Sequence, residues 1–298
     1  MALLDKKNQN LMNLIKKVHS VVENTDIEKH RQSQDHFGAL LGSSKDMSIR
    51  EVEIENMYGE WVSVNRAHMK KYVILYCHGG GYSTGSCIYA RTLTTKLAAS
   101  TSMDVLCFDY RLAPEFPYPA AFEDAMKAWN YLMLLGYGAR EVIIAGDSAG
   151  GNLALALVHR LKQEGRILPR GLLLMSPWTD LTCMGKSHET KQEVDPVLDA
   201  EYMQQMIHNY AEGQNLEDIF ISPLFGDFKD FPPTYIQVGD NEVLLNDSTM
   251  LHRKMAKENV SVKIDIFKGM WHVFQMSPFK TAYEAMDKNA EFIYDICR

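Results

Sequence analysis

Short apolar runs alternate with helical patterns along most of the chain after residue 50. Six of the runs are mostly apolar, and the continuous tracts among them, such as residues 142–145 and 172–175, are typical of parallel strands that are covered on both faces. These runs are residues 72–77, 105–110, 142–145, 172–175, 234–238 and 262–267. Helical patterns between them are residues 121–134, 152–163 and 248–257. We therefore expect one twisted, mostly parallel sheet with crossover helices on both faces.

Two earlier runs, residues 51–55 and 61–65, alternate apolar and polar positions. That pattern is typical of strands with one solvent-facing side. Tyr58 and Gly59 lie between them and predict the turn of an antiparallel hairpin. The hairpin brings the expected number of strands to eight.

Two segments do not fit this alternation. Residues 1–45 carry apolar side chains at helical spacings, namely Leu4, Leu11, Leu14, Ile15, Val18, Val21 and Val22. Residues 183–220 are too long for a plain connection and contain a helical stripe of Met203, Met206, Ile207 and Tyr210. Such helices can pack only on each other, or they can also cover the carboxyl edge of the sheet, where open α/β sheets bind ligands. We expect a helical cap from both segments, over a core of residues 46–182 and 221–298.

Composition and charge narrow the class of protein. There are 31 Lys and Arg against 38 Asp and Glu, a net charge of −7, which argues against nucleic acid as a partner. The longest strongly apolar stretches fall far short of the roughly 20 residues of a membrane-spanning helix. The N-terminus is too charged for a secretory signal.

The five cysteines are odd in number and lack C-x-x-C spacing. We therefore expect free thiols, no zinc site and a cytoplasmic location.

The sequence Gly-Asp-Ser-Ala-Gly at 146–150 stands directly between a predicted strand and a predicted helix. This is the context of a nucleophile elbow, a sharp turn that holds a serine in a strained conformation at the edge of a sheet. The glycines lack a Cβ, which lets the strand and the helix pass closely. The N-terminus of the helix would favour negative charge beside Ser148. Ser148 is therefore a candidate nucleophile.

His-Gly-Gly-Gly at 78–81 follows another predicted strand. Consecutive glycines let backbone N–H groups approach a small oxygen with no side chain between them. The N–H groups of Gly80, Gly81 and Ala149 would then form an oxyanion hole. A phosphate cradle would need Lys and then Ser or Thr after the glycines, and that pattern is absent here. His78 is interpreted as a structural hydrogen-bonding residue.

A serine nucleophile needs a general base, and His272 is the best candidate of the ten histidines. It follows the last strand and lies at the same sheet edge as Ser148, among bulky apolar neighbours. The orienting carboxylate is expected after the preceding strand, where Glu242 and Asp240 are equal candidates. Asp247 is interpreted as the cap of the next helix. The order serine, acid, histidine holds for each choice.

These motifs together resemble the hormone-sensitive-lipase-like group of α/β hydrolases. They are His-Gly-Gly-Gly at 78–81, Tyr-Arg-Leu-Ala-Pro-Glu at 110–115, Gly-Asp-Ser-Ala-Gly-Gly-Asn at 146–152, Ser-Pro-Trp-Thr-Asp at 176–180 and Trp-His-Val-Phe at 271–274. The resemblance covers nearly the whole chain from residue 50. It implies the α/β-hydrolase fold with a helical cap, and a triad of Ser148, His272 and an acid.

The family commonly has Asp-x-Leu at the acid position, and this chain has Glu242-Val243-Leu244. The match favours Glu242 and makes Asp240 the second choice. The resemblance also implies that Gly80, Gly81 and Ala149 form the oxyanion hole, and that Arg111 ties down its loop.

The resulting hypothesis is a serine carboxylesterase for short- to medium-chain acyl esters, with no metal and no cofactor. Two alternatives remain. One uses the same chemistry for deacetylation of sugars or small molecules, or for amide cleavage. The other is a small-ligand receptor on the same scaffold, but such receptors lose the histidine that is present here as His272. Met184, Met203 and Met206 suggest an adaptable apolar lining. An unpaired last strand, residues 262–267, suggests a homodimer.

Overall fold

The structure is a computed structural model that describes residues 12, 26–42, 45–68 and 70–298. The apolar positions that predict the N-terminal amphipathic helix, residues 4–22, lie outside the described residues. The first helix within the described part is α2, Ile27–Leu41. It begins at Asp26, whose carboxylate accepts a hydrogen bond from the Glu28 N–H, as expected of an N-cap residue.

The centre of the fold is one sheet of eight strands in the order β1-β2-β4-β3-β5-β6-β7-β8. The strands are β1 Met47–Ile54, β2 Met57–Val64, β3 Val73–Cys77, β4 Asp104–Phe108, β5 Val142–Asp147, β6 Gly171–Met175, β7 Thr234–Gly239 and β8 Val262–Phe267. β3 to β8 pair in parallel, and β1 and β2 add an antiparallel edge. The expected fold class, an eight-stranded mostly parallel α/β sheet, is confirmed.

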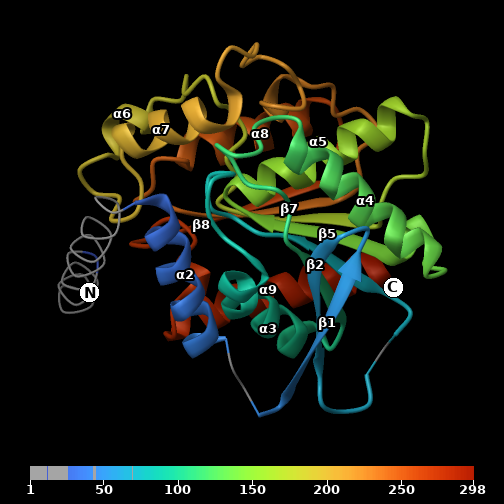
Figure 1. Cartoon of the computed structure of the whole chain (residues 1–298). Helices are drawn as coiled ribbons and strands as arrows, with labels where there is room; N and C mark the ends of the chain where they lie inside the picture. Colours follow the sequence, from blue (N-terminus) through green and yellow to red (C-terminus); the bar gives the residue numbers. More distant parts are fainter. Residues whose placement is uncertain (1–11, 13–25, 43–44, 69) are drawn as a thin grey trace.

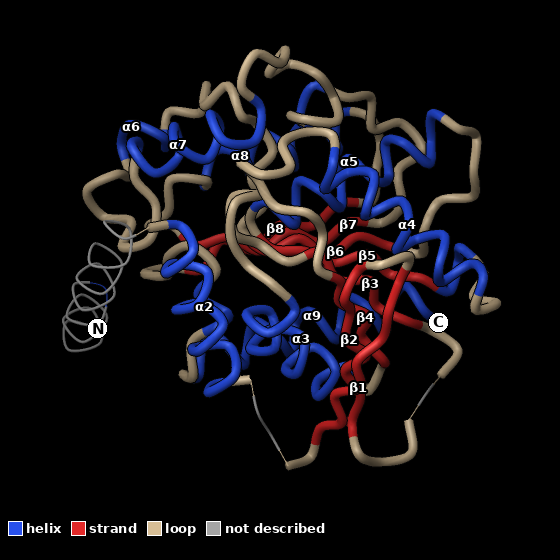
Figure 2. Tube along the Cα trace, in the orientation of Figure 1, coloured by secondary structure: helices blue, strands red, loops and turns tan. Residues whose placement is uncertain are grey.

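Both faces of the sheet are covered by helices, as Figure 2 shows. Successive strand residues point to opposite faces, so Val73 packs on one side and Ile74 on the other. On the first face lie α4 Ala120–Leu134, α5 Ala149–Gln163 and α8 Leu245–Lys257. On the second face lie α3 Cys87–Thr101 and α9 Lys280–Cys297. The short helices are α6 Ser187–Thr190, η1 Ala139–Glu141, η2 Pro223–Phe225 and η3 Phe274–Met276.

The antiparallel hairpin exists, but its turn was placed wrongly by the sequence pattern. Tyr58 and Gly59 lie inside β2, paired with Glu53 and Val52. The turn is instead Glu55 and Asn56, whose φ values of 46° and 69° are typical of a tight hairpin turn. Gly59 is required for close packing, because a Cβ there would lie 3.0 Å from the Cys107 carbonyl oxygen and 3.2 Å from the side chains of Ile54 and Val52 on β1.

Helices from both capping segments lie at the carboxyl end of the strands. α2 packs on α3, and Figure 1 shows α7, Ala200–Ala211, above α2 in the view. The predicted stripe on α7 is buried. Arg31 fixes α2 to the core, because it donates to the carbonyl oxygens of Ser83 and Ala113 at 2.9 Å and pairs with Glu115. The division into cap and core stays a prediction.

The remaining expectations concern oligomeric state, membrane insertion, the cysteines and cellular location. β8 lies at one edge of the sheet, as expected, and the homodimer through it stays a prediction. Across the described ranges, no helix combines the length and apolar character needed to cross a membrane. All five cysteines carry free thiols. The cytoplasmic location stays a prediction.

Candidate active site

Ser148 lies at a sharp turn between β5 and α5, with φ of 52° and ψ of −121°. This positive φ is a strained conformation for a non-glycine residue, and such strain clusters at functional sites. The turn is possible because its neighbours are glycines. A Cβ on Gly146 would lie 2.4 Å from the Gly150 carbonyl oxygen, and a Cβ on Gly150 would lie 2.0 Å from the Cys77 carbonyl oxygen. The predicted elbow is present.

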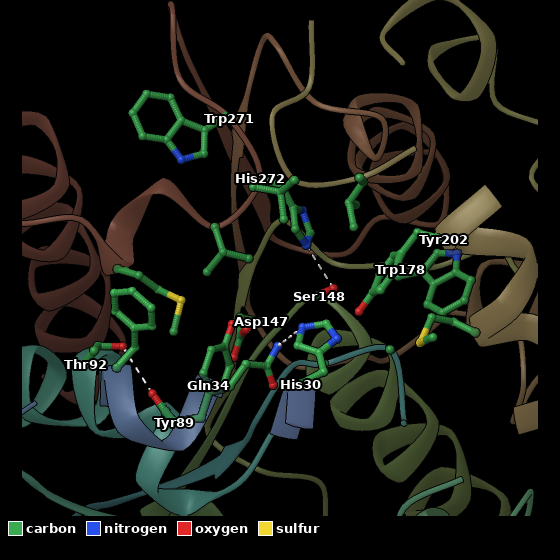
Figure 3. A pocket seen from close by; sticks show the side chains of 18 of the residues that line it. His30, Gln34, Tyr89, Thr92, Asp147, Ser148, Trp178, Tyr202, Trp271 and His272 are labelled. Carbon is green, nitrogen blue, oxygen red and sulfur yellow. Dashed lines mark hydrogen bonds between the residues drawn. The ribbon is translucent and has the colours of Figure 1, made fainter. Parts of the chain in front are cut away.

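Three side chains from distant parts of the chain form one hydrogen-bonded row at the sheet edge. The Ser148 Oγ lies 3.0 Å from His272 Nε2, and His272 Nδ1 lies 3.0 Å from a carboxylate oxygen of Glu242. Their exposed fractions are 8 %, 6 % and 0 %. Figure 3 shows the imidazole of His272 directed at Ser148. The structure therefore brings together the serine, the histidine and one of the two candidate acids.

The second carboxylate oxygen of Glu242 is held by two further groups. It accepts hydrogen bonds from the Ser176 Oγ at 3.0 Å and from the Gly239 N–H. Ser176 in turn accepts from the Val273 N–H at 3.2 Å, next to His272. A buried carboxylate with these partners has a defined orientation, and its charge stabilises a protonated imidazole.

The pKa of His272 is the balance of opposing effects. Burial alone lowers the pKa, because it disfavours the charged imidazolium. The hydrogen bond and charge of Glu242, with smaller effects of Asp195 and Asp147, outweigh burial and raise the pKa above its ordinary value of 6.5. A raised pKa makes this histidine a stronger base than a free imidazole.

The two other acids of this loop have different partners. Asp240 accepts a hydrogen bond from the Gly269 N–H at 2.6 Å and so holds the turn after β8. Asp247 was wrongly interpreted as a helix cap, because α8 already begins at Leu245. Its buried carboxylate instead pairs with His188 at 2.7 Å and accepts from the N–H groups of Thr179 and Asp180.

The glycine-rich loop after β3 presents free backbone donors. Gly80 and Gly81 have φ of 116° and 60°, a region that favours glycine. The N–H groups of Gly80, Gly81 and Ala149 donate to no other residue in the described part of the chain. His78 has the expected structural place, since its ring is buried, bonds the Gly79 carbonyl oxygen and stacks on Tyr110 at 4.1 Å.

A cavity of about 380 Å³ opens at Ser148 and His272. Its wall combines residues of α2, α3, α7 and the loops after β6 and β8, several of which Figure 3 shows. The apolar lining consists of Phe37, Trp178, Val197, Leu198, Met203, Met206, Trp271, Val273 and Met276. Met203 and Met206 are therefore lining residues, as expected. Met184 is not, because it lies on the surface with 57 % of its area exposed.

Several residues of the site were missed by sequence reasoning. Asp147 lines the cavity, and its carboxylate accepts from the Tyr76 hydroxyl at 2.6 Å and from the Gly79 N–H at 3.0 Å, which fixes the glycine-rich loop. Ser176, which donates to Glu242, belongs to the Ser-Pro-Trp-Thr-Asp motif, but the motif alone assigns it no role.

Two further expectations concern a loop residue and metal ligands. Arg111 was correctly expected to hold its loop in place, and it pairs with the buried Asp124 at 2.8 Å. Within the described residues, no group of three or more His, Cys, Asp or Glu side chains could hold a metal ion.

Comparison with known proteins agrees with this fold. Residues 74–276 match a family model described as an alpha/beta hydrolase fold. The chain is 38 % identical over 261 residues to an esterase of Acinetobacter venetianus, with 87 % of this chain and 86 % of that protein covered. It is 35 % identical to an acetyl-hydrolase of Streptomyces hygroscopicus, with 84 % and 83 % covered. A crystal structure of an esterase from the bacterial hormone-sensitive lipase family superposes with a TM-score of 0.90, at 28 % identity, and covers 96 % of this chain and 98 % of its own.

The chain belongs to the α/β-hydrolase fold family. Within it, the chain is a hormone-sensitive-lipase-like α/β hydrolase, as the motifs indicated. Its relatives identify it as a carboxylic-ester hydrolase. The receptor alternative is therefore not supported.

Proposed function

We propose that the protein is a serine carboxylesterase in which Ser148 is the nucleophile, His272 the general base and Glu242 the orienting acid. The observation that carries this proposal is the row of two 3.0 Å hydrogen bonds from the Ser148 Oγ through His272 to Glu242. Both distances are within reach for proton transfer and for fixing the imidazole tautomer. Glu242 accepts from Nδ1, so Nε2 is the free base that faces the serine.

In the first half of the proposed reaction, Ser148 attacks the ester carbonyl while His272 takes its proton. The tetrahedral oxyanion is stabilised by the N–H groups of Gly80, Gly81 and Ala149. His272 then gives its proton to the leaving alcohol, and an acyl-enzyme remains. In the second half, water gives a proton to His272 and attacks the acyl group. The bond between the Ser148 Oγ and the acyl carbon then breaks, His272 returns the proton to the Ser148 Oγ, and the carboxylic acid leaves.

The proposed substrates are esters with short to medium acyl chains, acetyl esters included. The cavity volume of about 380 Å³ lies near the low end of the range for small-molecule sites, about 300–1,000 Å³. Its mostly apolar lining favours hydrocarbon chains. Long chains would have to leave the cavity and would lose further burial energy.

A series of p-nitrophenyl esters from acetate to laurate tests this substrate range. We expect kcat/KM to peak between acetate and hexanoate and to fall by at least about tenfold at laurate, because added methylenes no longer find apolar surface. Acetylated xylo-oligosaccharides serve as a second arm for the deacetylase alternative. A maximum at laurate, or hydrolysis of the acetylated sugars alone, would contradict the proposed range.

The proposed base also predicts a pH dependence. Protonated His272 cannot accept the serine proton, so kcat/KM should fall as the pH drops through the raised pKa, with a midpoint above 6.5. Burial also raises the pKa of the neighbouring carboxyls of Asp147 and Asp195, to about 6. Glu242→Gln removes the stabilising charge and should move the midpoint to lower pH. A profile that is flat between pH 5 and 8 would contradict His272 as the base.

A further inference from the structure

One wall of the substrate cavity is polar, although the rest is apolar. His30 and Gln34 lie one turn apart on α2 and both line the cavity. His30 has 6 % of its area exposed, and its ring centroid lies 6.3 Å from that of Tyr202 on α7. Figure 3 shows His30 below Ser148 in the view, with one ring nitrogen joined to Gln34. A second histidine therefore borders the cavity that holds the proposed triad.

The orientation of the Gln34 amide is determined by the loop after β3. The Gly85 N–H donates to the Gln34 Oε1 at 3.0 Å, so that atom is the amide oxygen. The other end of the amide is then the NH2 group, and it lies 3.2 Å from His30 Nε2. An amide NH2 can only donate a hydrogen bond. His30 Nε2 must therefore accept, and it carries no proton.

A histidine that accepts at Nε2 carries its proton on Nδ1 when it is neutral. Burial lowers the pKa of His30, which keeps the ring neutral near pH 7. The doubly protonated ring would also place two donors against each other at Gln34. His30 thus offers one donor, the Nδ1–H.

The Nδ1–H has no acceptor among the residues that the structure describes, since the one side-chain hydrogen bond of His30 is at Nε2. His30 as a whole is largely removed from bulk solvent, and a donor that a bound ligand shields from water loses free energy when it stays unpaired. An ester substrate that fills the cavity excludes water from this wall. A hydrocarbon chain would leave the donor unpaired, and a chain with an oxygen at the right position would satisfy it.

We propose that His30, oriented by Gln34, forms a subsite for a hydrogen-bond-accepting oxygen of the substrate, away from the ester that is cleaved. The substrate class is an ester whose acyl or alcohol chain carries an ether, hydroxyl or second carbonyl oxygen. This inference rests on the proposed function, because it concerns the cavity at Ser148. His30 acts in recognition and not in proton transfer, since His272 already bonds the Ser148 Oγ.

The test compares pairs of esters that differ only by an oxygen in place of one methylene. One pair, p-nitrophenyl 3-methoxypropionate and p-nitrophenyl pentanoate, places the oxygen in the acyl chain. The other pair, 2-methoxyethyl butyrate and butyl butyrate, places it in the alcohol. The measured quantity is the ratio of the two kcat/KM values within each pair. Dividing the ratio of a variant by that of the wild type cancels differences in ester reactivity and in the amount of active enzyme.

We expect His30→Phe to lower this ratio by about 2- to 10-fold in at least one pair, the range for one neutral hydrogen bond. His30→Asn, which can place an amide N–H near the Nδ1 position, should retain most of the ratio. Thr92→Val is the matched control. It also makes one polar lining residue apolar, but the Thr92 hydroxyl already bonds the Tyr89 carbonyl oxygen, so the ratio should stay constant.

Ratios that are equal in the wild type and His30→Phe for both pairs would overturn the subsite, as would an equal loss in Thr92→Val. Either result leaves the proposed function intact, because that function is measured separately by hydrolysis of the hydrocarbon esters. Failure of the proposed function would appear instead as hydrolysis that persists without Ser148.

Discussion

Ser148→Ala is expected to lower kcat for p-nitrophenyl butyrate by at least about 10⁴-fold, because loss of a serine nucleophile removes the covalent route. The backbone should change little, since alanine keeps the Cβ and meets the same strain at φ of 52°. The substitution removes only the hydrogen bond to His272. The measurement is steady-state hydrolysis by protein purified without wild-type contamination.

The double variant of Ser148 and His272 provides a control for this prediction, because its loss of activity can be compared with that of each single variant. His272→Ala should cost about as much as Ser148→Ala, and the double variant should cost no more than either, because the two residues act as one unit. An unaltered unfolding temperature would show that the loss is chemical. If either single variant kept more than about a tenth of wild-type activity, the proposed triad would be wrong.

Glu242→Gln should have the second largest effect, a loss of about 10³- to 10⁴-fold in kcat, as expected when the orienting acid no longer fixes the imidazole tautomer. Asp240→Asn should cost far less, because Asp240 bonds the Gly269 N–H and acts on the loop rather than on the histidine. The two substitutions are the matched pair, since both convert a carboxylate to its amide three or fewer residues after β7.

Glu242→Asp gives an independent test of the same assignment. It keeps the charge but shortens the side chain by one methylene, so we expect activity between that of the wild type and Glu242→Gln. Circular dichroism and thermal unfolding of each variant are needed, because Glu242 also holds Ser176 and the Gly239 N–H. A larger loss in Asp240→Asn than in Glu242→Gln would transfer the role of the acid to Asp240.

Much of the candidate site could be predicted from the sequence, because its chemistry depends on residues next to strand ends. Ser148, the glycines at 79–81 and His272 each follow a predicted strand, and the carboxyl ends of parallel strands share one edge. The choice between Glu242 and Asp240 could not be made from spacing alone. Both lie within reach of that edge, and only the packed loop shows which one meets His272.

Other features depend on contacts that leave no local signal. Ser176 supports Glu242 across 66 positions of sequence, and Gln34 orients His30 only because the distant Gly85 N–H holds its oxygen. The hairpin turn was misplaced because a Tyr-Gly pair is typical of turns, whereas Gly59 is needed for close packing against Cys107. Asp247 looked like a helix cap, but its buried contact with His188 is a tertiary one.

The proposed mechanism requires a covalent bond between the acyl group and Ser148. Intact-mass measurement and peptide mapping after a rapid acid quench, with p-nitrophenyl acetate or a fluorophosphonate as reagent, observe that bond directly. We expect one adduct per chain, located on Ser148, and none in Ser148→Ala. An adduct on a different residue, or full hydrolytic activity with Ser148 never modified, would contradict the proposed mechanism.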